Sequence, residues 1–380
     1  MFQFISQQAE LEQVLTLMRQ NKIYGLDTEF IKVDTFWPKL GLFQINVENQ
    51  IFLLDGTTLH LNDFWKEIST AQQNIFHACG EDIDLIYHYS ARNKLDNVFD
   101  TQVAMSFLGH GLQVSYQNAL KQMLDIDIDK DQTRSDWLAR PLTKEQMSYA
   151  ANDVLYIVQL AEKLKTQLSE KSLYQQVLED CHHLTLEIGT ETPKDKLYTD
   201  VGNYRHSRRQ LMQLQLLCVW REEMVKALNQ PRSFLLKNST LIDLVEKNPK
   251  NTFQLSQVKD IRPNVVREFG KTILDIIKFL PEVDEWPLRM ARPIRHSSKD
   301  ITQNVDDLIQ KIANEIQVPK EVLMRKKWLT ALYQHIAFHG KEQDLPAYLL
   351  GWRYDLLTQP LIQLLSKDSE YLSMQMKVND

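Results

Sequence analysis

The stretch "IYGLDTEF", Ile23 to Phe30, joins the apolar run of a buried strand to two carboxylates, Asp27 and Glu29. Alternate side chains of a strand share one face, so both acids point the same way from the edge of a buried sheet. Like charges held side by side repel each other unless a cation lies between them. Acids at a strand end can also be merely solvated, and the pair needs support from elsewhere in the chain.

The segments that follow this stretch set the fold class. Residues 41–47, "GLFQINV", and 51–56, "IFLLDG", read as two more strands, and their connections are too short for parallel crossovers. Two later strands, in "NIFHACG" and "NVFDT", alternate with helical segments, the longest over about residues 144–168. We therefore predict an α/β domain over residues 1–170, in which a mixed sheet with an antiparallel meander is flanked by helices.

The remainder of the chain shows only helical periodicity, cut by Pro and Asn. An internal repeat divides it: "PRSFLLKNSTLIDL" from Pro231 aligns without gaps on "PKEVLMRKKWLTAL" from Pro319, with basic and apolar positions in register. Chance similarity between amphipathic helices is the alternative. We predict a helical connector over 171–202, a first small helical domain over 203–283, a linker over 284–299 and a second copy over 300–380.

The formal net charge of −6 hides an asymmetry between the two parts of the chain. Residues 1–170 hold 14 Lys and Arg against 23 Asp and Glu, a balance of −9, whereas residues 171–380 hold 30 against 27, a balance of +3. Residues 203–237 alone carry seven basic residues against two acids. This run is either a solvated helix face or a contact surface for a polyanion.

Composition excludes several classes of protein. The three cysteines, Cys79, Cys181 and Cys218, are too widely spaced for a disulfide framework or a zinc cluster and fit a reducing compartment. The first residues lack the basic and apolar regions of a signal peptide, and no run approaches about 18 consecutive apolar residues. Without a Walker loop or a GxGxxG motif, no nucleotide cofactor is indicated. We expect a cytoplasmic protein without a membrane partner.

Two further acidic motifs follow the first. In "HACGEDIDLIYHY", Asp82 at a helix start borders the apolar face, whereas Asp84 is about 200° further round and faces solvent. The helix dipole alone also explains an acid at Asp82. In "MSYAANDVLYIVQL", Tyr149 and Asp153 lie four residues apart on one helix and share an apolar face. An acid there is costly unless it is paired or bound to a metal ion.

Together the motifs place four carboxylates at one end of a sheet, which suits two hard divalent cations and displacement at phosphorus. The set resembles the motifs of the DEDD superfamily of 3′→5′ exonucleases, in the branch with Tyr in the last motif. Three flanking stretches, "TFWPKLGLFQI", "FDTQVAMSFLG" and "SDWLARPLT", resemble the bacterial ribonuclease D family. The two helical repeats resemble the helicase-and-ribonuclease-D C-terminal (HRDC) domain.

The resemblance implies a fold, an activity and roles for the motif residues. The fold is a ribonuclease H-like α/β exonuclease domain followed by two small all-α HRDC domains. The activity is that of a monomeric, metal-dependent exoribonuclease that trims RNA 3′ ends, notably of tRNA precursors and small structured RNAs, and releases 5′-mononucleotides. Two divalent ions, Mg²⁺ or Mn²⁺, are implied: Asp27, Glu29 and Asp153 hold one, Asp27 bridges to the second, and Asp82 completes the second site. Tyr149 positions the attacking water or helps to take its proton.

Other residues are expected to have smaller or structural roles. His77, at a strand end, is expected to be hydrogen-bonded structure and not a ligand. The candidate RNA contacts are basic residues near the motifs and in the basic run, each of which can equally be structural or solvated: Arg134, Arg140, Arg205, Arg208, Arg209, Arg232 and Lys237.

Two alternatives stay open at this point. A DNA-directed exonuclease would use the same chemistry, because preference for RNA depends on contacts to the 2′-hydroxyl that the sequence does not locate. A non-catalytic HRDC scaffold would need neither the four acids nor Tyr149, although all five residues are present.

Overall fold

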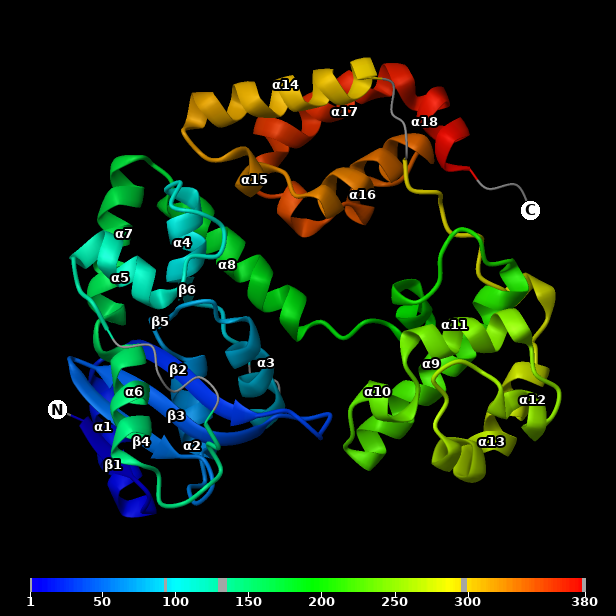
Figure 1. The fold of residues 1–380 in the computed structure, drawn as a ribbon. Helices are drawn as coiled ribbons and strands as arrows, with labels where there is room; N and C mark the ends of the chain where they lie inside the picture. Colours follow the sequence, from blue (N-terminus) through cyan, green and yellow to red (C-terminus); the bar gives the residue numbers. More distant parts are fainter. Residues whose placement is uncertain (1, 92–93, 129–134, 295–298, 378–380) are drawn as a thin grey trace.

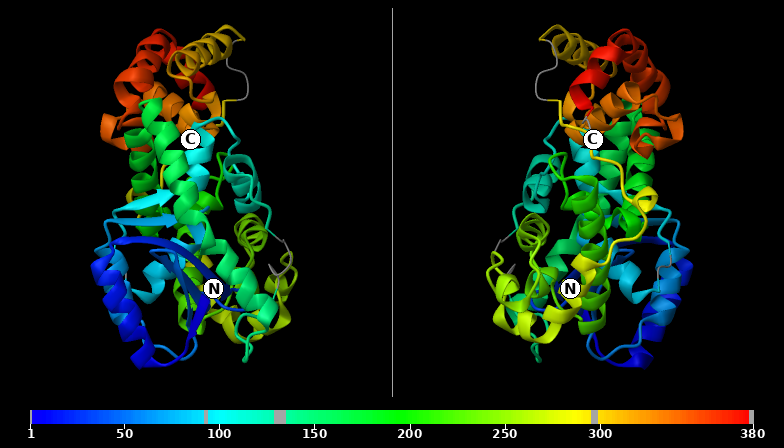
Figure 2. Two further views of the ribbon diagram at one scale, coloured as in Figure 1. Left: turned by 90° about the vertical axis from the view of Figure 1, so that its left-hand side faces the viewer. Right: turned by 90° about the vertical axis from the view of Figure 1, so that its right-hand side faces the viewer.

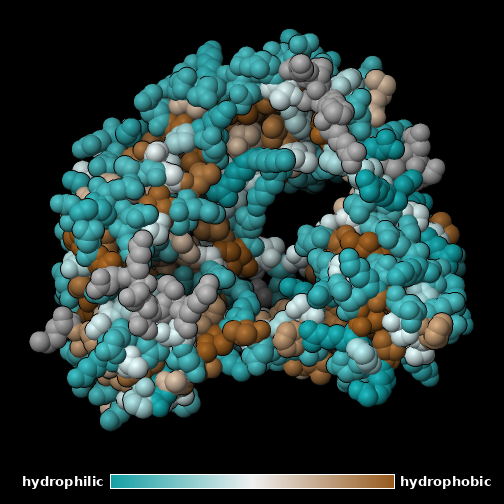
Figure 3. All heavy atoms as spheres, in the orientation of Figure 1, coloured by the Kyte–Doolittle hydropathy of each residue, from teal (hydrophilic) through white to brown (hydrophobic). Residues whose placement is uncertain are grey.

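The computed structural model describes residues 2–91, 94–128, 135–294 and 299–377 (Figure 1). It contains an α/β domain, a first helical domain that begins with α9 (Arg208–Leu228) and a second helical domain that begins with α14 (Lys299–Ile316). The second helical domain lies at the opposite end of the molecule from the sheet (Figure 2), and Figure 3 shows an opening between the three domains. Within the described ranges, no helix combines the length and apolar character needed to cross a bilayer.

Six strands form one mixed sheet in the order β1-β4-β3-β2-β5-β6. The predicted antiparallel meander is confirmed as β2, β3 and β4, while β1, β5 and β6 join in parallel. The first strand, β1, was not predicted. The strands are β1 (Phe2–Ile5), β2 (Ile23–Ile31), β3 (Lys39–Val47), β4 (Gln50–Asp55), β5 (Gln73–Phe76) and β6 (Val98–Asp100).

Apolar side chains from alternating strand positions form one core on each face of this sheet. Helices α1 to α3 cover one face, and α4 to α8 cover the other. The helices are α1 (Gln8–Gln20), α2 (Asn62–Ser69), α3 (Gly80–Tyr89), α4 (Thr101–Phe107), α5 (Tyr116–Leu124), α6 (Lys144–Leu155), α7 (Ile157–Glu170) and α8 (Tyr174–Gly189).

The prediction of one long helix over about residues 144–168 is wrong, because the chain forms two helices, α6 and α7, that meet at Tyr156. The reason lies in β3. The Asn46 side-chain amide donates to the carbonyls of Val154 and Leu155 at 2.8 and 3.2 Å. Side-chain donors of this kind satisfy carbonyl groups at a helix end, so the helix can stop there. Asp153 therefore lies in the last turn of a helix that is hydrogen-bonded to the sheet.

Helix α8 extends the α/β domain beyond the boundary predicted at residue 170. It packs against α3, α4 and β6, and the Asp100 N–H donates to Cys181 Sγ at 3.4 Å. The predicted connector over 171–202 is therefore divided between two domains. Its first half completes the helical layer over the sheet, and its second half contains a 3₁₀ helix, Lys194–Asp200, that packs on α9.

The two helical domains begin with the same order of elements: a long helix, a helix of four residues and a medium helix. Pro231 and Pro319 directly precede the four-residue helices, with φ angles of −58° and −57°. Of the predicted linker, 295–298 lie outside the described residues. The first domain contains α10 (Arg232–Leu235), α11 (Asn238–Lys247), α12 (Thr252–Ser256) and α13 (Pro263–Lys278), and the second contains α15 (Lys320–Leu323), α16 (Lys326–Ala337), α17 (Gln359–Leu365) and α18 (Ser369–Met376).

A buried ion pair joins the second helical domain to α8. The Arg353 guanidinium is fully buried and donates to both carboxylate oxygens of Asp180, at 2.6 and 2.7 Å. Its remaining bonds go to the carbonyls of Val322 and Leu323, and the Trp352 indole N–H also donates to Asp180 at 3.0 Å. A bidentate pair in which all three guanidinium nitrogens donate fixes the orientation of the two elements.

A second contact joins the loop between β2 and β3 to the first helical domain. The side-chain carbonyl of Asn229, which follows α9, accepts the backbone N–H groups of Phe36 and Trp37 at 3.1 and 3.0 Å. The Arg232 guanidinium lies over the Phe36 ring, 5.1 Å from its centre. The hairpin that carries Asp27 and Glu29 is thus attached to both the sheet and a helical domain.

Candidate active site

Two of the predicted carboxylates lie on the free part of the central strand β2. Asp27 is opposite Gln44 of β3 and Glu29 is opposite Leu42, so both acids point to the sheet face that α6 covers. On its other side β2 pairs with β5 only over Ile23–Gly25. Beyond that point, no strand in the described part of the chain pairs with this edge of β2, and a pocket that contains Asp27 and Glu29 opens there.

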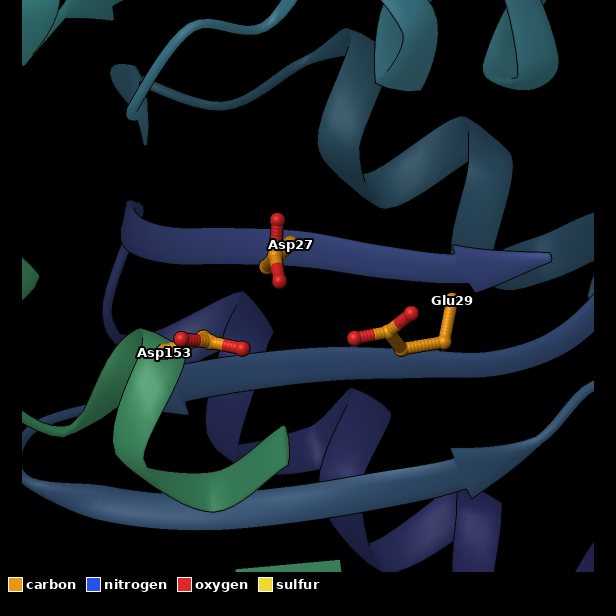
Figure 4. A group of neighbouring side chains, drawn as sticks. All are labelled: Asp27, Glu29 and Asp153. Carbon is orange, nitrogen blue, oxygen red and sulfur yellow. The ribbon is translucent and has the colours of Figure 1, made fainter. Parts of the chain in front are cut away.

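Asp153 approaches the same face from α6. Thr143 caps this helix: its hydroxyl accepts the Gln146 N–H at 3.1 Å, and the Gln146 side chain accepts the Thr143 N–H at 2.9 Å. Carboxylate oxygens of Asp27, Glu29 and Asp153 all lie within 4.8 Å of one another (Figure 4). The structure therefore brings together the three acids predicted to share one cation.

Tyr149 lies one turn before Asp153 and lines the same pocket. The centre of its ring lies 6.2 Å from that of Trp137, whose side chain is 2% exposed. The Tyr149 hydroxyl stabilises the ionised form of Asp153, while burial and the surrounding acids raise the pKa of Tyr149 well above its usual value. The phenol is therefore neutral near pH 7 and acts there as a hydrogen-bond donor.

The fourth acid, Asp82, enters from the first turn of α3. Asp100 fixes this turn, because its carboxylate accepts the N–H groups of Ala78 and Cys79 at 3.1 and 2.8 Å. Asp82 is 8% exposed and accepts a short hydrogen bond from the Thr28 hydroxyl. Asp84, by contrast, is exposed and pairs with Lys32 at 3.1 Å. The structure places Asp82, and not Asp84, beside the other acids.

The four acids have abnormally high pKa values because burial and mutual repulsion disfavour their ionised forms. Burial is the largest cause for each: it raises the pKa of Asp82 to about 6, of Asp153 to about 7 and of Glu29 to about 9, and the pKa of Asp27 rises well above its usual range. Their neighbours add to this, since Asp82, Asp153 and Glu29 all raise the pKa of Asp27. Among the described residues, the pocket of 420 Å³ that contains them is lined by no Lys or Arg. Within the described lining, protons or a bound cation have to balance this charge.

Eight other described residues line the pocket besides the predicted set: Thr28, Phe30, His77, Ala78, Glu81, Tyr116, Gln117 and Ile157. His77 is held as expected, with its ring nitrogens 2.8 Å from the Thr101 hydroxyl and the Val114 carbonyl. Tyr116 and Gln117 begin α5, and no spacing rule connects them to the acidic motifs. The sequence therefore gave no reason to select them.

Most of the predicted RNA-binding residues are already engaged within the protein. All five N–H groups of Arg140 are used, by both oxygens of Asp55 and by the carbonyls of Trp137, Ala139 and Gly41. This arrangement leaves Arg140 no donor for a phosphate and favours a structural role.

The basic run is divided in the same way. Arg208 donates to three carbonyls of residues 283–287, and Arg232 forms a bidentate pair with Glu222 at 2.6 and 2.8 Å. Lys237 lies 3.8 Å from Asp260 and is half exposed. Arg205, beside the Tyr204 ring, and Arg209 are exposed. Arg134 lies outside the described residues.

Comparison with protein families agrees with this site. Residues 2–169 match the family model described as a 3′-5′ exonuclease, and residues 210–277 match the HRDC domain model. The four acids and Tyr149 all lie within the first match. Divalent-metal dependence is a property of this exonuclease superfamily, and the acidic cluster provides the ligands that it requires.

Full-length relatives extend the similarity to the whole chain. A ribonuclease D from Pseudomonas paraeruginosa is 34% identical over 96% of this chain and 97% of its own length. A ribonuclease D from Shewanella is 30% identical over 96% of this chain and 94% of its own length. The crystal structure of Escherichia coli RNase D superposes with a TM-score of 0.89, at 25% identity, over 97% of this chain and 99% of that one. The chain therefore belongs to the ribonuclease D family of exoribonucleases.

Proposed function

We propose that this enzyme removes nucleotides one at a time from the 3′ ends of tRNA precursors and small structured RNAs, and that its four acids hold two divalent cations. The observation that carries the proposal is the convergence of Asp27, Glu29 and Asp153 within 4.8 Å, with no Lys or Arg among the described lining of the pocket. Carboxylate oxygens are the preferred ligands of hard divalent cations.

The donor set assigns each acid a place. Asp27, Glu29 and Asp153 form one group of ligands, and Asp82 lies outside that group but close enough to raise the pKa of Asp27. Asp27 would therefore help to hold both cations. Two bound cations, Mg²⁺ or Mn²⁺, would supply Lewis-acid stabilisation of the charge that develops on the phosphate.

Tyr149 orients the attacking water, as in the Tyr-containing branch of the superfamily. Its neutral hydroxyl lies in the pocket beside Asp153. The Trp137 ring packs near the Tyr149 ring, which would limit the positions that the Tyr149 hydroxyl can take when it donates to the attacking water. This role acts on the transition state more than on substrate binding.

The helical domains provide the surface for the body of the RNA. We assign residues 300–380 to a second HRDC domain, since it begins with the same order of helices as the first domain and the aligned Pro231 and Pro319 have the same position. Residues 171–380 carry the positive charge balance, and polyanions bind positively charged surfaces. The three cysteines are free and buried, which suits the cytoplasm.

The Escherichia coli relative is described as an exoribonuclease involved in structured RNA processing, which supports this class of substrate. A tRNA precursor with a 3′ extension and a DNA hairpin with the same tail test the proposal. We expect stepwise shortening of the RNA to near the mature 3′ end, release of nucleoside 5′-monophosphates, and much slower attack on DNA. Equal rates on the two polymers would contradict the RNA assignment, and products with 3′-phosphates would contradict the chemistry.

A further inference from the structure

The strand β3 carries two buried amides on the face that α6 covers, Gln44 and Asn46, and both are fully buried. The Asn46 amide is hydrogen-bonded, since its nitrogen donates to α6 and its oxygen accepts the Asn49 N–H at 3.0 Å. For Gln44, neither the amide nitrogen nor the amide oxygen has a hydrogen-bond partner among the described residues. An unpaired buried amide is unfavourable and calls for an explanation.

The position of Gln44 provides one. Its direct partner on β2 is Asp27, and its partner on β4 is Leu53. Directly opposed residues of an antiparallel pair point to the same face, with Cβ atoms about 4.5–5.5 Å apart. Along β3 its neighbours on this face are Leu42, which is opposite Glu29, and Asn46. Gln44 is therefore the buried polar group beneath the acidic cluster.

We propose that Gln44 is a positioning residue of the metal centre, whose amide N–H holds the Asp27 carboxylate when the cations are bound. Without cations, the carboxylates are crowded together and have no fixed orientation to offer this donor. If one Asp27 oxygen bound a cation, the free lone pairs of the carboxylate could accept a hydrogen bond from the Gln44 amide. Donors behind the ligands orient them, and their loss typically weakens metal binding about 10- to 100-fold. This inference rests on the proposed metal centre.

The substitution Gln44→Met tests it, because Met has nearly the same length and lacks the amide. In EDTA the variant should melt at or above the temperature of the wild type, since an unpaired amide is removed. Isothermal titration with Mn²⁺ should show affinity about 10- to 100-fold weaker than that of the wild type. The Mn²⁺ concentration for half-maximal RNA hydrolysis should rise by the same factor, and kcat should recover at saturating Mn²⁺.

Gln213→Met is the matched control. This Gln is also buried, at 1% exposed, but its amide donates to the Ile277 carbonyl at 2.9 Å in the first helical domain. Loss of a paired amide should lower the melting temperature in EDTA and leave Mn²⁺ affinity unchanged. Gln44→Met should therefore weaken Mn²⁺ binding without lowering the melting temperature in EDTA, and Gln213→Met should lower the melting temperature without weakening Mn²⁺ binding.

If Gln44→Met binds Mn²⁺ with the affinity of the wild type, the proposal is wrong. If Gln44→Met melts at a lower temperature than the wild type in EDTA, the Gln44 amide is already paired without metal, and the premise is wrong. Should the variant fail to fold, Gln44→Asn decides, because it withdraws the donor by one methylene; unchanged affinity there overturns the role. Asp153→Asn separates this inference from the metal centre itself. If Asp153→Asn weakens Mn²⁺ binding and Gln44→Met does not, only the role of Gln44 fails; if neither does, the metal centre fails.

Discussion

Tyr149 and Asp153 share one turn of α6 but have separable roles at the residue scale. Tyr149→Phe removes the hydroxyl and keeps the ring that packs on Trp137. We expect kcat to fall by about 10- to 100-fold, with KM changed much less, because a water-orienting group acts on the transition state. Steady-state kinetics on a short single-stranded RNA measure both parameters. A kcat equal to that of the wild type would return Tyr149 to a purely structural role.

The pKa values of the acids predict how pH affects the metal-free protein. Their values in the folded state, about 6 for Asp82, about 7 for Asp153 and about 9 for Glu29, exceed the value of about 4 expected in the unfolded chain. Between these limits the folded state binds more protons, so the free energy of unfolding falls as pH rises from about 4 to about 9. Melting in EDTA should show this fall, and added Mg²⁺ should reduce it. Asp27→Asn should flatten the EDTA curve, and a pH-independent melting temperature would contradict the repulsion described here.

Sequence alone located the acids better than the basic residues. An acid in an apolar helix stripe or strand end is locally anomalous, so Asp27 and Asp153 could be found from their neighbours. Arg140 was ambiguous because its partner, Asp55, lies at the end of β4, 85 positions away. Gln44 was visible as a polar residue within "GLFQINV", but the lack of a partner for its amide is a property of the packed fold.

At the scale of elements, the Arg353–Asp180 pair fixes the second helical domain on α8. Asp180→Asn would leave the guanidinium of Arg353 buried without its counter-charge. We expect this variant to lose about 3–5 kcal/mol in the free energy of unfolding, measured by urea denaturation. Lys327→Ala is the control at the same contact: it removes an ion pair with Glu187 in which both side chains are more than half exposed, and should cost less than about 1 kcal/mol. Equal costs would show that burial does not govern this interface.

The elements that the sequence predicted correctly are those with a strong local pattern. The meander of β2, β3 and β4 follows from short connections, and the all-helical structure of the rest of the chain follows from its periodicity. The junction of α6 and α7 could not be foreseen, because residues 144–168 keep helical periodicity and the break depends on Asn46, about a hundred residues earlier. The packing of α8 on the α/β domain, past the predicted boundary at residue 170, could not be foreseen for a similar reason, since it depends on contacts with α3, α4 and β6.

The whole molecule separates negative charge around the active site from positive charge in the helical part. If that positive charge contacts RNA, affinity falls with added salt, with a log–log slope of about −0.7 to −0.9 per phosphate contact. Arg205, just before α9, and Arg209, in its first turn, are two exposed members of the basic run. Replacing both with Ala should flatten the slope by one to two contacts, measured by fluorescence anisotropy with a structured RNA.

Arg19 and Lys22 provide the control for that measurement, because they lie in the negatively charged half and pair with Glu67 at 2.9 and 3.0 Å. Their double Ala variant should keep the wild-type slope. If the Arg205 and Arg209 variant also keeps it, those two side chains are only solvated and the RNA binds elsewhere.

The central claim is that the acids beside β2 cleave RNA from its 3′ end only when divalent cations are bound. The direct measurement is hydrolysis of a 5′-end-labelled RNA with a single-stranded 3′ tail, in Mg²⁺, Mn²⁺ or EDTA, by the wild type, Asp153→Asn and Asp84→Asn. We predict a ladder that shortens one nucleotide at a time with metal, no shortening in EDTA or by Asp153→Asn, and wild-type shortening by Asp84→Asn, whose exposed carboxylate pairs only with Lys32 among the described residues. Shortening in EDTA, or by Asp153→Asn at the wild-type rate, would contradict the account.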